Sequence, residues 1–129
     1  MFSKNRPLSP HLQIYRPQLT SLMSILHRLT GAGLALGAAL AAWWLATLAF
    51  NVGPGQNIDG SFFFKFVRSP LGQAMLLCWL WAYVYHFLSG LRHLFWDAGY
   101  GFDIKTVYRS GWFVLWGSVF LAIAIWGLS

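Results

Sequence analysis

Long runs without charge alternate with short charged segments along the 129 residues of this chain. No Asp, Glu, Lys or Arg occurs in residues 29–58, 69–91 or 110–129. Each run contains a stretch close to the ~20 apolar residues that an α-helix needs to cross a bilayer. The pattern therefore predicts an all-α membrane protein with three transmembrane helices, at about 25–51, 70–96 and 107–128.

Local signals at the ends of these runs agree with the three predicted spans. The first helix can start at Thr20 or Ser21, which are both good N-caps. Ser69 followed by Pro70 is typical of an N-cap and the first residue of a helix. Asp103 or Ser110 is suited to cap the third span. Because residues 61–66 are rich in phenylalanine, we expect this segment to lie along the outer membrane surface.

Charged side chains are few and unevenly placed. They make up 9% of the chain, against about 25% in a typical soluble domain. Of the nine Lys and Arg residues, Lys65 and Arg68 lie in the first loop. The other seven lie in the N-terminal segment, at the start of the first span or around the second loop: Lys4, Arg6, Arg16, Arg28, Arg92, Lys105 and Arg109. By the positive-inside rule, the N-terminus and the second loop are then cytoplasmic.

This placement changes how the basic excess is interpreted. The excess indicates topology and contact with anionic membrane lipid or an acidic partner, and no nucleic-acid partner is expected. We expect residues 1–129 to form one transmembrane domain, with residues 1–20 as a cytoplasmic N-terminal segment in which three prolines disfavour a helix. The first apolar run is long enough to span, and no cleavable signal or Arg- and Ser-rich presequence is apparent. The sequence therefore predicts a multi-pass protein located in a bacterial cell inner membrane.

One histidine lies deep inside the second predicted span. His86 is about ten residues from Trp96, or roughly 15 Å along a helix, which is near the bilayer midplane. An ionisable residue at that depth is a candidate functional site, and imidazole is the commonest metal ligand, with haem an obvious host in a membrane. Gly90, one turn later on the same face, would let a flat macrocycle lie close. The alternative is a histidine hydrogen-bonded to a neighbouring helix, with Gly90 only a packing notch.

A second group of polar residues lies at the inner end of the first span. Arg28 is placed to pair with a propionate or a quinone carbonyl, and Ser24 is placed to donate a hydrogen bond to the quinone. His27 lies at the edge of the same helical stripe. The alternative is that Arg28 is a topology anchor whose charged end reaches the membrane surface.

Depth separates the histidines further. His27 and His93 are expected at the cytoplasmic boundary and His86 about two turns deeper, so no histidine of this chain is expected to face His86. A haem with two histidine ligands would then take its second ligand from another chain. A haem between His27 and His93 would lie nearly in the headgroups, and a Cys78 ligand would lie about two turns outside His86. We favour neither of these two sites.

Three further side chains receive a structural interpretation. His11, in the proline-rich lead, is expected to face solvent or a partner, and Tyr83 is placed to support a ligand or simply to pack. Asp97 is placed to contact His93 one turn earlier or to pair with Arg92.

Three motifs together resemble a known family. They are Arg6-Pro-Leu-Ser-Pro-His-Leu-Gln-Ile-Tyr, Ser24-Ile-Leu-His-Arg-Leu-Thr-Gly and His86-x-x-x-Gly-x-Arg-His-x-x-x-Asp. In this order, with three spans, they resemble the cytochrome b subunits that anchor succinate dehydrogenase in the membrane. The resemblance covers about residues 6 to 109.

The resemblance implies a set of residue roles. The position of His86 is an axial ligand of haem b in this family, and a second small membrane-anchor subunit supplies the other ligand. Ser24 and Arg28 match positions that line the ubiquinone site, which the iron–sulfur subunit and the second anchor complete. His27 and Arg28 lie near the haem propionates, and Gly90 and His93 belong with them to the haem periphery, His93 as a haem-edge or structural residue.

The resemblance also implies a division of labour. A flavoprotein subunit would oxidise succinate, and iron–sulfur clusters would carry the electrons to quinone at the membrane. This chain would be a non-flavin subunit of succinate:quinone oxidoreductase that helps to bind haem and quinone in a helical bundle with the second anchor. The alternative is a haem-free structural anchor for a soluble oxidoreductase. A transporter subunit is disfavoured because the spans contain no acid and no inverted repeat.

Overall fold

Four α-helices make up the computed structural model, which describes residues 16–51 and 62–129. The helices are α1 (Leu19–Asn51), α2 (Phe62–Arg68), α3 (Pro70–Asp97) and α4 (Ile104–Leu128). Helices α1, α3 and α4 are each long and apolar enough to cross a membrane, which confirms the all-α class and the three spans. The predictions for His11 and the N-terminal motif lie outside the described residues.

Helix α1 begins at Leu19, close to the predicted N-cap candidates Thr20 and Ser21 and before the span expected from about residue 25. Its first turn closes where the Leu22 amide donates to the Gln18 carbonyl at 3.1 Å. The apolar run alone gave the later start, but the polar residues between 20 and 28 continue the same helix. The predicted N-terminal segment 1–20 therefore overlaps the first turn of α1.

The other two long helices start at capping residues that the sequence indicates. The Ser69 side chain accepts a hydrogen bond from the Gly72 amide at 3.2 Å, and Pro70 is the first residue of α3. Asp103, and not Ser110, caps α4, because its carboxylate accepts from the Lys105 amide at 3.1 Å. This cap explains why α4 starts at Ile104 rather than at about residue 107.

A short turn joins α3 to α4. The Gly99 amide donates to the Trp96 carbonyl at 2.8 Å, and the Tyr100 amide donates to the Phe95 carbonyl at 3.0 Å. Gly99 and Gly101 have φ angles of 87° and 83°, in the left-handed region that glycine adopts without strain. The tight turn makes α3 and α4 antiparallel neighbours.

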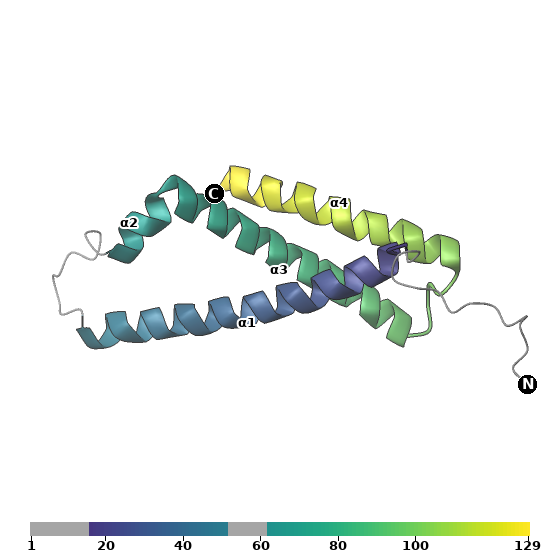
Figure 1. Cartoon of the computed structure of the whole chain (residues 1–129), viewed down its shortest axis with the longest axis horizontal. Coiled ribbons are helices and arrows are strands. Elements are labelled where there is room, and N and C mark those ends of the chain that lie inside the picture. Colours follow the sequence, from purple (N-terminus) through teal and green to yellow (C-terminus); the bar gives the residue numbers. More distant parts are fainter. Residues whose placement is uncertain (1–15, 52–61) are drawn as a thin grey trace, which may run out of the picture.

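Helix α3 lies between α1 and α4, and the three helices meet near the α3–α4 turn (Figure 1). Their common core contains Met23, Tyr85 and Val114, with exposed fractions of 2%, 0% and 5%. The Tyr85 hydroxyl donates to the Met23 carbonyl at 2.9 Å, and the Trp81 indole donates to the Ser118 hydroxyl at 3.2 Å. These bonds join α3 to α1 on one side and to α4 on the other, as polar side chains commonly do in membrane bundles.

The segment predicted to lie on the outer membrane surface forms a short helix, α2. The Trp44 ring stacks on the Phe63 ring at 4.1 Å, which joins the far end of α1 to α2. Lys65 and Arg68 lie in the last turn of α2, where they interact favourably with the helix dipole.

Most of the large apolar side chains face outward. Leu36, Trp43, Phe113 and Phe120 are between 64% and 72% exposed, and they are spread over α1 and α4. Such a surface is stable in lipid or against other apolar chains and not in water. The protein is therefore a multi-pass membrane protein with a small internal core.

Candidate functional site: a histidine cluster where α1 crosses α3

Three histidines meet where α1 crosses α3 near the α3–α4 turn. The rings of His27 and His86 are stacked with centroids 4.0 Å apart and planes inclined by 6°. The ring of His93 also stacks on His27, with the two ring centroids 5.1 Å apart. His27 therefore lies between the two histidines that α3 contributes.

One nitrogen of His86 is held by α1. Its Nδ1 lies 3.1 Å from the His27 carbonyl oxygen and 3.3 Å from the Thr30 hydroxyl. Because the carbonyl can only accept, Nδ1 carries the proton and donates. Thr30 uses its own proton toward the carbonyls of Leu26 and His27, at 2.8 Å and 3.0 Å, so its oxygen can accept from Nδ1. The Nε2 lone pair of His86 then has no partner within residues 16–51 and 62–129.

The other two rings are held differently. Nδ1 of His93 donates to the Ser89 carbonyl at 2.7 Å, one turn earlier in α3. Nδ1 of His27 is buried and has no hydrogen-bond partner among the described residues. An unpaired buried polar atom is costly and calls for an explanation, such as a group that binds there.

Two glycines shape the space beside the His86 ring. A Cβ atom at Gly31 would lie 2.8 Å from Cε1 of His86, so only glycine allows the ring to lie this close to α1. A Cβ atom at Gly90 would meet no atom of the described residues within 4 Å. The surface of α3 next to His86 is therefore open, as the sequence predicts for a position where a flat group can approach.

The expected depths of the histidines were wrong for His27. The sequence placed His27 at the cytoplasmic boundary, two turns above His86, whereas the two rings are in contact. The reason is the crossing of α1 over α3, which brings His27 in the third turn of α1 against His86. Parallel stacked rings cannot both present a nitrogen to opposite sides of one metal, so the expectation of a second ligand from another chain is unaffected.

The alternative site between His27 and His93 is closed. Their rings are stacked at an angle of 25° with centroids 5.1 Å apart, which leaves no room for a macrocycle between them. Cys78 is exposed on α3, two turns from His86.

Ser24 and Arg28 lie one turn apart on α1, next to the histidine cluster in sequence. Ser24 is half-buried and Arg28 is exposed, and neither has a hydrogen-bond partner in the described part of the chain. Their polar atoms are free to meet a ligand or a partner chain at this end of the helices.

Two predicted pairings are not formed. Asp97 contacts neither His93 nor Arg92 within the described residues, because Arg92 points to α4 instead. Tyr83 is 60% exposed and does not support the histidine cluster.

Thr30 is the residue that the sequence analysis missed. It is 7% exposed and lies three residues after His27, on the α1 face that meets His86. The available signal was a threonine inside an apolar span, since polar side chains in such helices usually bond across to a neighbour.

A model of a known protein family matches residues 3–125 of this chain, and its description is succinate dehydrogenase/fumarate reductase transmembrane subunit. The chain belongs to this family. The fold of three spans and the order of the motifs agree with the membership, which confirms the resemblance seen in the sequence.

Relatives of this transmembrane subunit come from bacteria and from a plant. The succinate dehydrogenase cytochrome b556 subunit of Paracoccus denitrificans is 45% identical over 119 residues, covering 92% of this chain and 88% of that protein. The cytochrome b556 subunit of Rickettsia conorii is 40% identical over 121 residues, covering 94% and 90%. The cytochrome b560 subunit of Marchantia polymorpha is 38% identical over 119 residues, covering 92% and 87%.

The cytochrome b names of these relatives imply haem in those proteins. The site in this family member fits such a group on three observations of its own. His86 has one nitrogen anchored and one free, Gly90 leaves the adjacent surface open, and Nδ1 of His27 is a buried donor or acceptor that lacks a partner.

Proposed function

We propose that this chain is the membrane-anchor subunit of a succinate:quinone oxidoreductase, with Nε2 of His86 as one axial ligand of haem b. The observation that carries the proposal is the anchoring of Nδ1 by the His27 carbonyl and the Thr30 hydroxyl. Metal-binding histidines almost always donate their other ring N–H to such a partner, which fixes the tautomer and the ring orientation. The second ligand comes from the second anchor subunit.

The remaining residues of the cluster form the periphery of the haem. Gly90 allows the macrocycle to lie against α3, and the His27 ring stacks on the ring of the proposed ligand. Arg28 supplies a positive charge at the exposed edge, and His93 holds the other face of His27. When bound, haem b supplies a one-electron carrier close to the quinone.

The haem assignment is tested by haem content in the assembled complex. We expect His86→Ala to remove most of the bound haem and its Soret absorption. His93→Ala is the matched control, because it removes a second imidazole of the cluster whose Nδ1 is also anchored, by its own helix, and so shows which of the two rings holds the haem. Full haem content with an unchanged spectrum in His86→Ala would contradict the assignment and favour a haem-free structural anchor.

We further propose that Ser24 and Arg28 form part of the ubiquinone-reduction site. Both lie at the end of α1 that meets the α3–α4 turn, and both keep polar atoms free of protein partners in the described residues. The Ser24 hydroxyl and the Arg28 guanidinium are hydrogen-bond donors suited to quinone carbonyl oxygens, whose basicity rises as the ring is reduced. The iron–sulfur subunit completes this site and delivers the electrons.

Activity measured with two acceptors tests the quinone assignment. Ser24→Ala and Arg28→Gln should each lower succinate:ubiquinone reductase activity by about tenfold or more, as expected when a donor to a developing charge is lost. Reduction of an artificial dye by the flavoprotein and iron–sulfur subunits should persist. Equal loss of both activities would show that the two residues act in assembly instead.

The charge distribution supports an orientation for the whole subunit. Five described cations lie at the α3–α4 turn end: Arg16, Arg28, Arg92, Lys105 and Arg109. At the other end the described cations are Lys65 and Arg68. We therefore propose that residues 1–129 form one domain of a bacterial inner membrane with a cytoplasmic N-terminus. Three spans then place Ser129 on the outer side of the membrane, so an alkaline phosphatase fused after Ser129 should be active. An inactive fusion would contradict this orientation.

A further inference from the structure

A hollow of about 360 Å³ lies between α3 and α4 near their connecting turn. This volume is within the range of about 300–1,000 Å³ that is usual for small-molecule sites. The aliphatic and phenylalanine side chains of its lining come from both helices: Leu88, Leu91, Phe95, Phe113 and Val114. At 100° per residue, Leu88 and Leu91 lie on the face of α3 opposite His86 and His93. Trp96 lies between the two sites, because it lines the hollow and its ring is 5.3 Å from the ring of His93.

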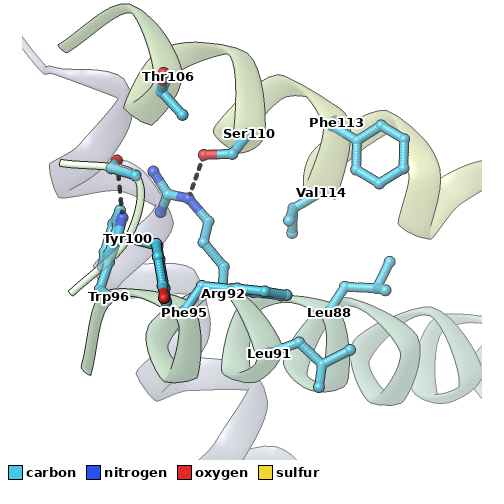
Figure 2. Close-up of a pocket in the computed structure, with 11 residues that line it drawn as sticks. Leu88, Leu91, Arg92, Phe95, Trp96, Tyr100, Thr106, Ser110, Phe113 and Val114 are labelled. Carbon is cyan, nitrogen blue, oxygen red and sulfur yellow. Dashed lines mark hydrogen bonds between the residues drawn. The ribbon is translucent and has the colours of Figure 1, made fainter. Parts of the chain in front are cut away.

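Arg92 is the charged residue of this hollow. It is 7% exposed, and its guanidinium reaches from α3 toward α4 (Figure 2). Nε donates to the Ser110 hydroxyl at 2.9 Å, and one Nη donates to the Val107 carbonyl at 2.8 Å. The guanidinium carbon also lies 4.0 Å from the centre of the Trp96 ring. The other Nη has no acceptor in the described part of the chain.

No carboxylate balances this buried charge among the described residues. Asp97 does not reach Arg92, and the Asp103 carboxylate caps α4 through the Lys105 amide. Neutral acceptors and an aromatic ring leave the positive charge in place, and a buried charge without a counter-ion is costly. An anion held in the hollow would offset that cost.

The surroundings indicate which anion fits. Lys105 and Arg109 are exposed on the first turns of α4, at the same end of the helices. The apolar wall of the hollow is open to the membrane, since Leu91 is 38% exposed and Phe113 is 72% exposed. Basic pockets between transmembrane helices, close to the membrane surface, bind phospholipid head groups, and the planar guanidinium matches phosphate oxygens.

We propose that the hollow binds an anionic phospholipid of the leaflet at the α3–α4 turn. The phosphate accepts from the free Nη of Arg92, and one acyl chain lies along Leu88, Leu91 and Phe113. A neutral quinone would fill the apolar part but would leave the charge unbalanced, so the phospholipid is the favoured occupant.

Native mass spectrometry of the complete, delipidated complex tests this site. The complex is titrated with phosphatidylglycerol and with phosphatidylcholine of the same acyl chains. We expect one phosphatidylglycerol per copy of this chain to bind about tenfold more tightly than phosphatidylcholine, as expected for one basic contact with extra negative charge. Arg92→Gln should remove this preference. Lys65→Gln, which removes a cation of α2 that does not line the hollow, should retain it.

A second variant keeps the test decisive, because Arg92 also braces α3 against α4. Leu91→Trp fills the hollow and leaves Arg92 in place, so it should abolish the bound phosphatidylglycerol. Leu94→Trp is the control, since Leu94 is 62% exposed and lies outside the hollow. Binding that survives both Arg92→Gln and Leu91→Trp would overturn the proposal. So would one-for-one displacement of the lipid by ubiquinone.

Discussion

The His27 carbonyl, together with Thr30, determines which nitrogen of His86 is available to a ligand. The hydroxyl proton of Thr30 is directed at the carbonyls of its own helix, which leaves its oxygen to accept from Nδ1 of His86. The proton on Nδ1 in turn leaves Nε2 as a lone pair. The function of His86 therefore depends on a neighbour that touches neither haem nor quinone.

Gly31 offers the sharpest test at the level of a single residue. In Gly31→Ala the new methyl group would lie 2.8 Å from Cε1 of His86, so the ring must move and its bond from Nδ1 must lengthen. We expect haem affinity to fall by about tenfold or more, as when other partners of a metal-binding histidine are lost. The haem content of the purified complex after dilution measures this effect.

Gly33→Ala is the matched control for that prediction. A Cβ atom there meets no atom of the described residues within 4 Å, so the same substitution two residues away should leave haem affinity unchanged. Equal effects of the two variants would show that the close approach at Gly31 does not position His86.

At the level of the helices, the sequence predicted the starts that depend on local chemistry. The sequence indicated Ser69 with Pro70 as the start of α3 and Asp103 as one of two possible caps of α4, because an N-cap acts within one turn. The start of α1 at Leu19 is close to the N-cap candidates Thr20 and Ser21, and only the apolar span from about residue 25 omitted the polar first turns. The stack of His27 on His86 could not be predicted, since it depends on where α1 crosses α3, and no spacing within one helix contains that information.

The contact between α1 and α3 depends on Tyr85. Its side chain is fully buried, and its hydroxyl donates to the Met23 carbonyl at 2.9 Å. Tyr85→Phe should lower the free energy of unfolding by about 0.6–1.5 kcal/mol, the usual contribution of an interhelical hydrogen bond in a membrane. Thermal unfolding of the complex in detergent measures the loss. Tyr83→Phe should cause no loss, because Tyr83 is 60% exposed, and a similar loss in both variants would contradict the role of the bond.

At the level of the whole molecule, the proposed haem site at His86 is not enclosed by this chain alone. None of the most apolar window of α1 is buried, and Gly90 borders empty space in the described structure. The sequence argument for this incompleteness used the depth of His27, which was wrong, and a second ligand from another chain stays a prediction. The structure gives a better reason. Within the described residues, His27 contacts His86 through its ring and its carbonyl oxygen. Because the two rings are stacked, His27 cannot oppose His86 across a metal.

Replacement of one axial ligand by another tests the central claim most directly. His86→Met and His93→Met are introduced separately into the complete complex, and low-temperature EPR spectra and haem midpoint potentials are measured. Because methionine ligation raises the potential relative to two histidines, we expect His86→Met alone to lose the two-histidine signal and to shift the potential upward. His93→Met should leave both unchanged. An unaltered signal and potential in His86→Met would contradict the assignment of His86 as the iron ligand.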